Sequence, residues 1–237
     1  MKNMLLILSV LINSDLVCQK VIDVEKNDYK VTSSQFYAVG GEPVSSTKYV
    51  RVVRGTPYFR DFFIKGKVIM MAGNVYDSIL LRLDLRDNTL QYIDPGGKEM
   101  IVTSPAVRSV IFYDSASGKI YEFDHSAFWQ ATNKIEKGWY QLIADGQAAL
   151  YKRLIKVINE NQPYGSATME QTIIDITEYY IFVNSVFTHI KKFKAITELL
   201  NDKKDMLNKY ISINRLTGRS DSDYIALIDY YNNLLAK

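Results

Sequence analysis

The strongest constraint on the fold is a regular alternation of short apolar runs and turn-forming clusters between Tyr49 and Phe123. The clusters are AGN (72–74), RDN (86–88), DPGG (94–97) and DSASG (114–118), each rich in residues that tolerate turn conformations. Apolar runs of about five to ten residues between such clusters are typical of strands joined by tight connections. The pattern predicts an antiparallel meander.

Alternation within one of these runs places its charges on a solvated face. In residues 75–83, every second residue is apolar apart from Asp77, and polar residues mostly fill the positions between. Asp84, Asp87 and Asp94 fall near strand ends, where aspartate commonly accepts hydrogen bonds from nearby backbone amides. We therefore expect these carboxylates to shape turns rather than to catalyse a reaction.

Two β-hairpins are predicted after residue 138. WYQLIADGQAALYKRL (139–154) has Asp145-Gly146 between two apolar segments, and YYIFVNSVFTHIKKF (179–193) has Asn184-Ser185 at the corresponding place. Residues 150–158 fit a helical face as well as a strand, and we favour a strand that continues the first hairpin. The two hairpins predict a second, smaller sheet.

The end of the chain has the pattern of two helices. Asp202 with Asp205 predicts the start of the first, TGRS (217–220) its end, and Ser220 with Asp223 the start of the second. In the second helix, apolar residues recur at three- and four-residue steps: Tyr224, Leu227, Ile228, Tyr231, Leu234 and Leu235. Such a stripe must pack on the second sheet or on a partner.

These patterns predict an α+β protein: an antiparallel β meander, as a sheet or a partial barrel, followed by a smaller hairpin-based sheet packed with C-terminal helices. The expected segments are a signal peptide at 1–18, an irregular lead-in at 19–47, an antiparallel β domain at 48–126 and an α+β domain at 138–237. A length of 237 residues and a hydrophobic content of 47% are enough for such cores.

The first residues have the outline of a secretory signal peptide. Lys2 precedes an apolar run at 4–12, which is about half of the roughly 20 residues that a membrane-spanning helix needs. Cleavage after Cys18 would leave a mature chain without cysteine; lipidation of Cys18 is the alternative, disfavoured by Asp15 and Val17. An exported chain without disulfides fits the periplasm or the outer membrane of a bacterium, and no transmembrane helix is expected in the mature chain.

Motifs for metal, cofactor or nucleophile chemistry are missing from the sequence. The two histidines, His125 and His189, are far apart in the sequence, so no pair of ligands has the spacing of a zinc-binding motif. Asp124, His125 and Ser126 name the residue types of a catalytic triad, but adjacent residues point in different directions and form no relay. DLRDNTLQYIDPGG (84–97) supplies oxygen ligands for a calcium alternative, without the order of an EF-hand loop. We expect no cofactor.

A hydrolase that uses acidic residues stays an alternative, because two acids distant in sequence can meet in space. The candidates are Asp61, Asp77, Asp84 and Glu122, and no pattern positions them against each other. Whether the protein is an enzyme is therefore left open, with a non-catalytic role favoured.

The stretch 191–219 has the clearest local charge bias. Its candidate contact residues for a membrane or a partner are Lys191, Lys192, Lys194, Lys203, Lys204 and Lys209. Such a face could approach anionic lipid headgroups, although a solvated amphipathic surface is the plainer interpretation. The net charge of +3 is too mild to indicate a nucleic-acid partner.

Four segments carry a resemblance to known proteins: GTPYFRDFFIKGKVIM (55–70), LLRLDLRDNTLQYID (80–94), KGWYQLI (137–143) and PYGSATMEQT (163–172). With them the chain resembles uncharacterised exported, periplasmic proteins of Gram-negative bacteria that have a strand-rich front and a hairpin-plus-helix back. The resemblance implies export and this division of the chain. It implies no activity and no catalytic residues.

The sequence thus favours a non-catalytic binding or structural module of the bacterial envelope, whose partner is an envelope protein or a glycan. Exposed tyrosine rings, of which the chain has 17 candidates, could stack on sugars or bind a protein. The alternatives are the acidic hydrolase and a membrane-surface adaptor that uses the basic face of residues 191–219.

Overall fold

The computed structural model describes residues 21–23, 41–43, 50–102, 106–129, 135–165 and 168–236, with side chains from residue 51 onward. The predicted signal peptide at 1–18, with Cys18, lies outside these residues. Of the predicted lead-in at 19–47, the described parts are two short strands, β1 (Val21–Asp23) and β2 (Gly41–Pro43).

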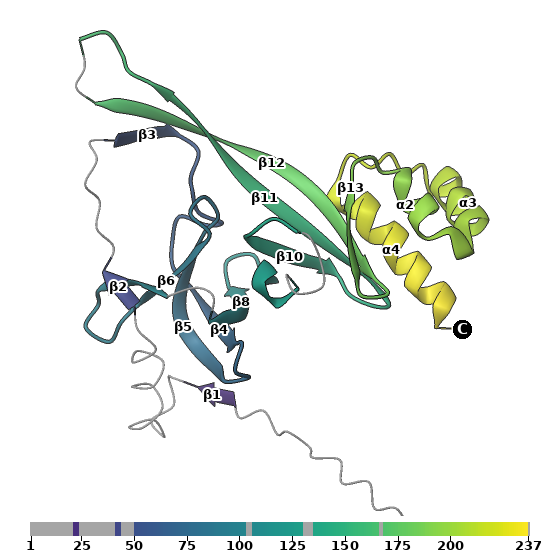
Figure 1. The fold of residues 1–237 in the computed structure, drawn as a ribbon, viewed down its shortest axis with the longest axis horizontal. Coiled ribbons are helices and arrows are strands. Elements are labelled where there is room, and N and C mark those ends of the chain that lie inside the picture. The colour runs from purple at the N-terminus through teal and green to yellow at the C-terminus, as the bar shows by residue number, and fades with distance from the viewer. Residues whose placement is uncertain are drawn as a thin grey trace, which may run out of the picture.

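The protein is α+β, with one large open sheet and a group of helices at one end of it (Figure 1). The strand order is β13-β12-β11-β10-β9-β8-β4-β5-β6-β7-β2, with β1 beside β5 and β3 beside β12. β1 pairs with β5 in parallel, and β3 pairs with β12 in parallel. The other pairs, such as β10–β11 and β11–β12, are antiparallel, so the sheet is mixed. The remaining strands are β3 (Val50–Arg54), β4 (Ile64–Met70), β5 (Val75–Asp84), β6 (Thr89–Ile93), β7 (Glu99–Val102), β8 (Val107–Asp114), β9 (Lys119–His125), β10 (Trp139–Ala144), β11 (Ala148–Asn161), β12 (Met169–Val183) and β13 (Val186–Ile190).

The four turn clusters lie where the sequence predicts connections. They join β4 to β5, β5 to β6, β6 to β7 and β8 to β9. Asp84 Oδ1 accepts hydrogen bonds from the backbone amides of Arg86 (2.9 Å) and Asp87 (2.8 Å), and Asp94 Oδ1 accepts from those of Gly96 and Lys98 (both 2.8 Å). These two aspartates shape turns, as expected.

The alternation predicted for β5 is confirmed from Ile79 to Leu83 and is wrong towards both ends, since Asp84 is buried instead of solvated. Ile79, Leu81 and Leu83 are buried, but Tyr76, which alternation places on the solvated face, is buried as well. The pairing of β4 with β5 passes from Gly66–Ile79 to Val68–Tyr76, so β5 has an extra residue there. A β-bulge of this kind breaks the period of two. Ser78, with φ of 61°, sits in it.

The predicted smaller sheet is not separate from the meander. β10 pairs with β9, with Tyr140 opposite Asp124, so the strands of both predicted sections belong to one hydrogen-bonded sheet. Both hairpins are present: β10 with β11, and β12 with β13, where Asn184 and Ser185 have the positive φ values of a tight two-residue turn. Residues 150–158 are strand, inside β11.

The helices cover one face of the sheet at β10 to β13. They are α2 (Ala195–Leu199), η2 (Asn201–Lys203), α3 (Lys204–Asn214) and α4 (Asp221–Leu235); a short turn, η1 (Ser126–Phe128), follows β9. The apolar stripe of α4 packs on the sheet, with Leu227 and Ile228 in one cluster with Leu150 and Ile181. Tyr179 stacks on Tyr224 at 3.8 Å between ring centroids.

The predicted helix caps are wrong in detail. Asp202 lies inside η2 and accepts a hydrogen bond from the hydroxyl of Tyr231 (3.2 Å), and α3 begins without a side-chain cap. Ser220 is the N-cap residue of α4 but makes no capping hydrogen bond. Asp223 instead accepts from the backbone amides of the TGRS turn, such as that of Gly218 at 2.8 Å. Each carboxylate therefore binds a neighbouring segment rather than its own helix start.

One residue of α4 joins the helices to the first hairpin. The Asn232 side chain accepts a hydrogen bond from the backbone amide of Ala148 (2.9 Å) and donates to the carbonyl oxygens of Ala148 (3.0 Å) and Asp145 (3.2 Å). A Cβ on Gly146 would lie 2.3 Å from Asn232 Nδ2, so the turn needs glycine there. The hairpin turn and the helix thus fit each other.

Candidate functional site

The four acids considered for a hydrolase are engaged at separate places. Asp61 accepts a hydrogen bond from the Thr56 hydroxyl, and Asp77 lies 3.4 Å from Lys67 Nζ. Asp84 shapes its turn, and Glu122 lies on β9. The structure therefore pairs none of these four acids with another.

Asp124, two residues after Glu122, is a buried acid that the sequence analysis considered only as a triad residue type. Asp124 is 8% exposed and accepts hydrogen bonds from the hydroxyls of Ser109 and Tyr151, the latter at 2.9 Å. Burial raises the pKa of Asp124 and, together with the charge of Asp124, the pKa of Glu122. The expectation that carboxylates stay on wet faces is wrong here. Both oxygens of Asp124 accept from protein groups, so the arrangement is structural.

The neighbours of Asp124 form no catalytic relay with it. His125 Nδ1 accepts a hydrogen bond from the Ala127 amide (3.3 Å), and the ring packs edge-on against Trp139. Burial lowers the pKa of His125. Ser126 Oγ accepts from the Gly138 amide at 3.0 Å. Among the described residues, no group of three or more histidine, cysteine, aspartate or glutamate side chains is placed to hold a metal ion.

Replacing Asp124 by asparagine tests this burial through its pH dependence. A carboxyl whose pKa is higher in the folded than in the unfolded state makes the folded state bind its proton more tightly, so ionisation costs stability. This cost is absent below the pKa of the unfolded state, 3.8, and grows as the pH rises through the pKa of the folded state. We expect the stability of Asp124→Asn, relative to the wild type, to increase between about pH 3 and pH 7 in urea titrations.

Asp229→Asn is the control variant, because it changes the net charge by the same amount at an exposed position of α4. A stability difference between Asp124→Asn and the wild type that stays flat, or falls with rising pH, contradicts the burial argument. The direction of the trend decides the matter, because the replacement also alters the hydrogen bonds from Ser109 and Tyr151.

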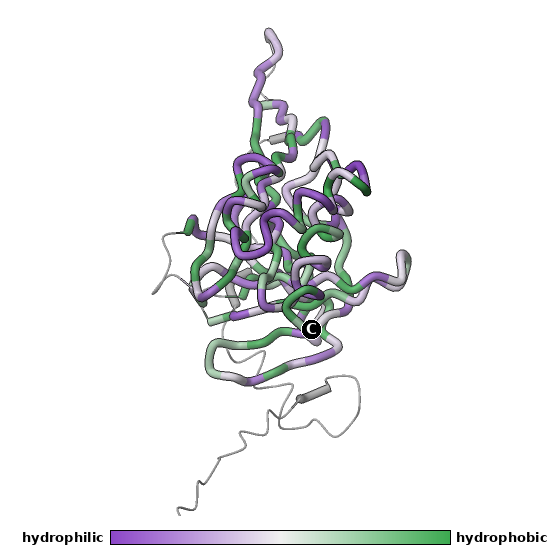
Figure 2. The backbone as a smooth tube through the Cα atoms, turned by 90° about the vertical axis from the view of Figure 1, so that its right-hand side faces the viewer, coloured by the Kyte–Doolittle hydropathy of each residue, from purple (hydrophilic) through white to green (hydrophobic). Residues whose placement is uncertain are grey.

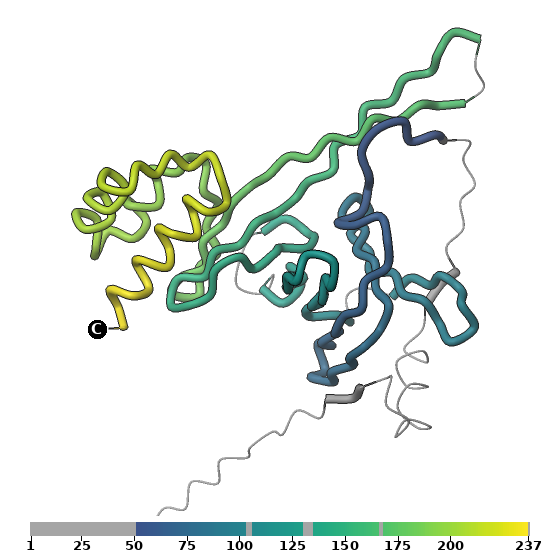
Figure 3. Tube along the Cα trace, turned by 180° about the vertical axis from the view of Figure 1, so that it is seen from behind, coloured from purple at the N-terminus to yellow at the C-terminus, as the bar shows by residue number. Residues whose placement is uncertain are grey.

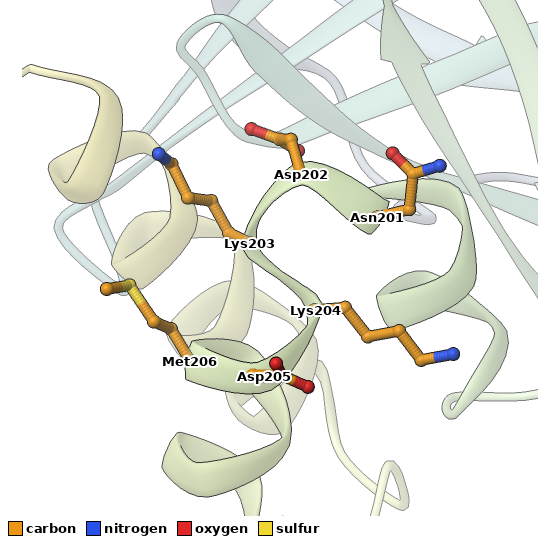
Figure 4. Close-up of a pocket in the computed structure, with 6 residues that line it drawn as sticks. All are labelled: Asn201, Asp202, Lys203, Lys204, Asp205 and Met206. Carbon is orange, nitrogen blue, oxygen red and sulfur yellow. The ribbon is translucent and has the colours of Figure 1, made fainter.

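The six candidate lysines do not converge on one site. Lys191, Lys192 and Lys194 are exposed after β13, whereas Lys203 and Lys204 are half-buried at the start of α3 and Lys209 is exposed further along it. Lys204 binds Glu198 at 2.8 Å. A pocket of about 400 Å³ is lined by residues 201–206. In Figure 4 the Lys203 and Lys204 side chains point to opposite sides.

The most distinctive surface is an arm formed by two long strands. We call residues 153–161 of β11 and 169–178 of β12 the arm, because they continue past the pairing of these strands with β10 and β13. The arm projects beyond the rest of the sheet, away from the helices (Figures 1 and 3). β3 pairs with its far end, opposite Met169 to Thr172.

One face of the arm is apolar and exposed. Ile155 lies opposite Ile176 and Val157 opposite Ile174, so these four side chains share a face; we call them the apolar strip. Ile174 and Ile176 are each 47% exposed, and Ile155 and Val157 are half-buried. The hydrophilic end of the arm, at the top of Figure 2, gives way to hydrophobic residues below it. A two-stranded ribbon of this kind usually needs a further layer to be stable.

Charged pairs border the apolar strip. At the base of the arm, Arg153 Nη1 lies 2.5 Å from Glu136 Oε2 and 3.7 Å from Glu178 Oε2. Tyr180 donates its hydroxyl hydrogen bond to Glu178 (2.8 Å), and Tyr180 belongs to an aromatic cluster with Trp129, Tyr140 and Phe187. The charges at the base of the apolar strip are therefore paired. On the opposite face of the arm, Lys156 lies 2.8 Å from Asp175.

Sequence reasoning missed this surface. The alternation of Ile174, Asp175, Ile176 and Thr177 is a strand signal, but exposure depends on which layer covers the strand, and periodicity does not report that. A comparison of the chain with protein-family models, curated proteins and solved structures finds no match. No helix among the described residues is long and apolar enough to cross a membrane.

Proposed function

We propose that this chain is a non-catalytic binding module of the bacterial envelope that holds a partner on its arm. The observation that carries the proposal is the apolar strip, whose two most exposed members, Ile174 and Ile176, are each 47% exposed on a ribbon that projects from the body. Contiguous exposed apolar residues rimmed by polar ones are characteristic of interaction sites.

The chemistry of the strip favours a protein partner over a glycan. Sugar binding uses exposed aromatic faces, but Tyr140, Tyr151 and Tyr180 are buried in the aromatic cluster. Tyr164, at the tip of the arm, is a fully exposed ring, and one ring offers a small stacking platform. Aliphatic β-branched side chains on an extended ribbon instead match a second extended segment or an apolar protein face.

Export is part of the proposal, and its support is the amino-terminal sequence. Lys2, the apolar run at 4–12 and the polar stretch up to Cys18 have the composition of a secretory signal. The partner is accordingly a protein of the periplasm or the outer membrane.

The test is capture from an envelope extract with two matched variants. Ile174→Lys with Ile176→Lys places two charges on the apolar strip, so we expect the captured partner to fall at least about tenfold, a loss of about 1.4 kcal/mol or more in binding. Ile120→Lys with Ile213→Lys is the control, because these isoleucines are 69% and 68% exposed outside the arm. Quantitative mass spectrometry measures the recovery. Equal recovery with both double variants would refute the proposal.

A membrane-surface adaptor is the second candidate, favoured by the exposed lysines at 191, 192 and 194. It requires binding to anionic vesicles that weakens as salt rises. Glu198 neutralises Lys204, and the half-buried position of Lys203 further reduces the basic face, so the arm is the better-supported surface.

A further inference from the structure

The arm has one long open edge. β10 pairs with β11 as far as Lys152, which lies opposite Gln141, and no strand of the described residues pairs with that side of β11 beyond it. On its other side, β11 is paired with β12 along its whole length. The backbone of residues 153–161 therefore presents free hydrogen-bonding groups along one edge, which is a template for another strand.

The opposite edge of the arm is largely closed. β3 occupies the β12 edge from Met169 to Thr172, and β13 occupies it from Tyr179 to Val183. Residues 173–178 of β12 lie between β3 and β13, which already occupy the two ends of this edge. A long strand can add to the β11 edge, but it would collide with β3 or β13 on the β12 edge.

The open edge lacks the usual protection against its own copies. Residues 153–161 contain no proline or glycine, and both of their basic residues are neutralised within the chain, Arg153 by Glu136 and Lys156 by Asp175. Over the arm and β3 together, basic and acidic residues are equal in number: Arg51, Arg54, Arg153 and Lys156 against Glu160, Glu170, Asp175 and Glu178. An identical surface is therefore not repelled by net charge.

We propose that the β11 edge pairs with the same edge of a second copy of this chain. The two strands run antiparallel about a two-fold axis at Val157, the midpoint of residues 153–161, so that the whole open edge is used without displacing β10. Val157 of one copy then lies opposite Val157 of the other, and Ile155 opposite Asn159. The two arms form one ribbon of four strands in the order β12-β11-β11-β12.

This pairing closes at two copies. It uses the long open edge of both chains, and the β12 edges that remain outermost are occupied at their ends by β3 and β13. It also sets the two apolar strips side by side on one face. The dimer thus widens the surface on which the proposed function rests, but its existence does not depend on an envelope partner.

Cysteine cross-linking tests the pairing in the whole protein. Directly opposite residues of an antiparallel pair have Cα atoms about 4.5–5.5 Å apart, which suits a disulfide. In a Cys18→Ser background, which removes the single natural cysteine, Val157→Cys should form a covalent dimer under mild oxidation. Ile174→Cys is the control: it lies opposite Val157 within the same arm but one strand further from the axis.

Sedimentation of the purified protein gives the second readout. We expect the wild-type mass to rise to twice the monomer value with concentration, and Val157→Lys to weaken the dimer at least about tenfold because two like charges meet at the axis. Ile174→Lys should leave it dimeric. A wild type that stays monomeric up to about 100 µM, or equal cross-linking at positions 157 and 174, overturns the proposal. A monomer that still captures an arm-dependent envelope partner would refute the dimer and leave the proposed function standing.

Discussion

Replacing Ile181 by alanine is expected to lower the free energy of unfolding by about 2–5 kcal/mol, because the change leaves a cavity in a packed core. Ile181 is fully buried, at 0% exposure, between Leu150 on the neighbouring strand and the α4 side chains Leu227 and Ile228. The same replacement at Ile176, five residues earlier in the same strand and 47% exposed, should change stability by less than about 0.5 kcal/mol.

Urea unfolding of the two variants, followed by circular dichroism, measures this contrast. The pair has the same chemistry and the same strand, so the difference reports burial alone. If Ile176→Ala costs as much as Ile181→Ala, the apolar strip belongs to the folded core, and the reason for assigning it to a partner disappears. A small cost at Ile176 means that folding does not require this isoleucine.

Replacing Gly55 by alanine is expected to detach β3 from the arm. Gly55 has φ of +80°, and an added Cβ would lie 2.2 Å from the carbonyl oxygen of Ile173, a backbone atom that cannot move aside alone. The positive φ costs about 1–2 kcal/mol for alanine, and the forced displacement adds about 1–3 kcal/mol. Amide hydrogen exchange should lose protection at residues 169–172, where β3 pairs with β12.

Gly73→Ala is the matched control for this experiment. Gly73 also has a positive φ, +87°, but an added Cβ would meet nothing within 4 Å. Its cost should therefore be the conformational part alone, with exchange at residues 169–172 unchanged. If both variants expose residues 169–172 equally, the close approach of β3 to Ile173 does not hold this part of the arm.

Local signals in the sequence predicted most of the strands and turns. The clusters AGN, RDN, DPGG and DSASG stand at four strand connections, and Asn184-Ser185 turns a hairpin, because turn chemistry depends on a few adjacent residues. The α4 stripe followed from its three- and four-residue steps. These features are encoded within windows of about ten to fifteen residues.

The features that sequence reasoning missed depend on residues distant in the chain. β9 and β10 join the two predicted sections into one sheet, and β3 adds in parallel to β12 more than a hundred positions away. Asp124 is buried because Ser109 and Tyr151 supply donors from two other strands. The bulge at Ser78 turns the Tyr76 side chain to the buried face of the sheet, which strict alternation does not predict.

The candidate site was missed for the same reason. Ile174 and Ile176 have the alternating pattern of an ordinary half-buried strand; the strand is correct, but residues 174–177 are all exposed. By strand alternation the two isoleucines lie on the face of Tyr180, opposite the face of Ile181 on which the helices pack. The aromatic cluster with Trp129 and Tyr140 covers their face only near the hairpin turns, and the arm extends beyond it (Figures 1 and 3). The length of the β11–β12 pairing beyond that cluster decides this, and sequence patterns locate strand ends poorly.

Site-specific photo-cross-linking in living cells tests the arm as a binding surface most directly. A photoreactive phenylalanine derivative at position 176 should cross-link to a discrete envelope protein. The same residue at position 213, an isoleucine 68% exposed on α3, should give none above background. Absence of any cross-link at position 176, or equal cross-linking at both positions, would contradict the account.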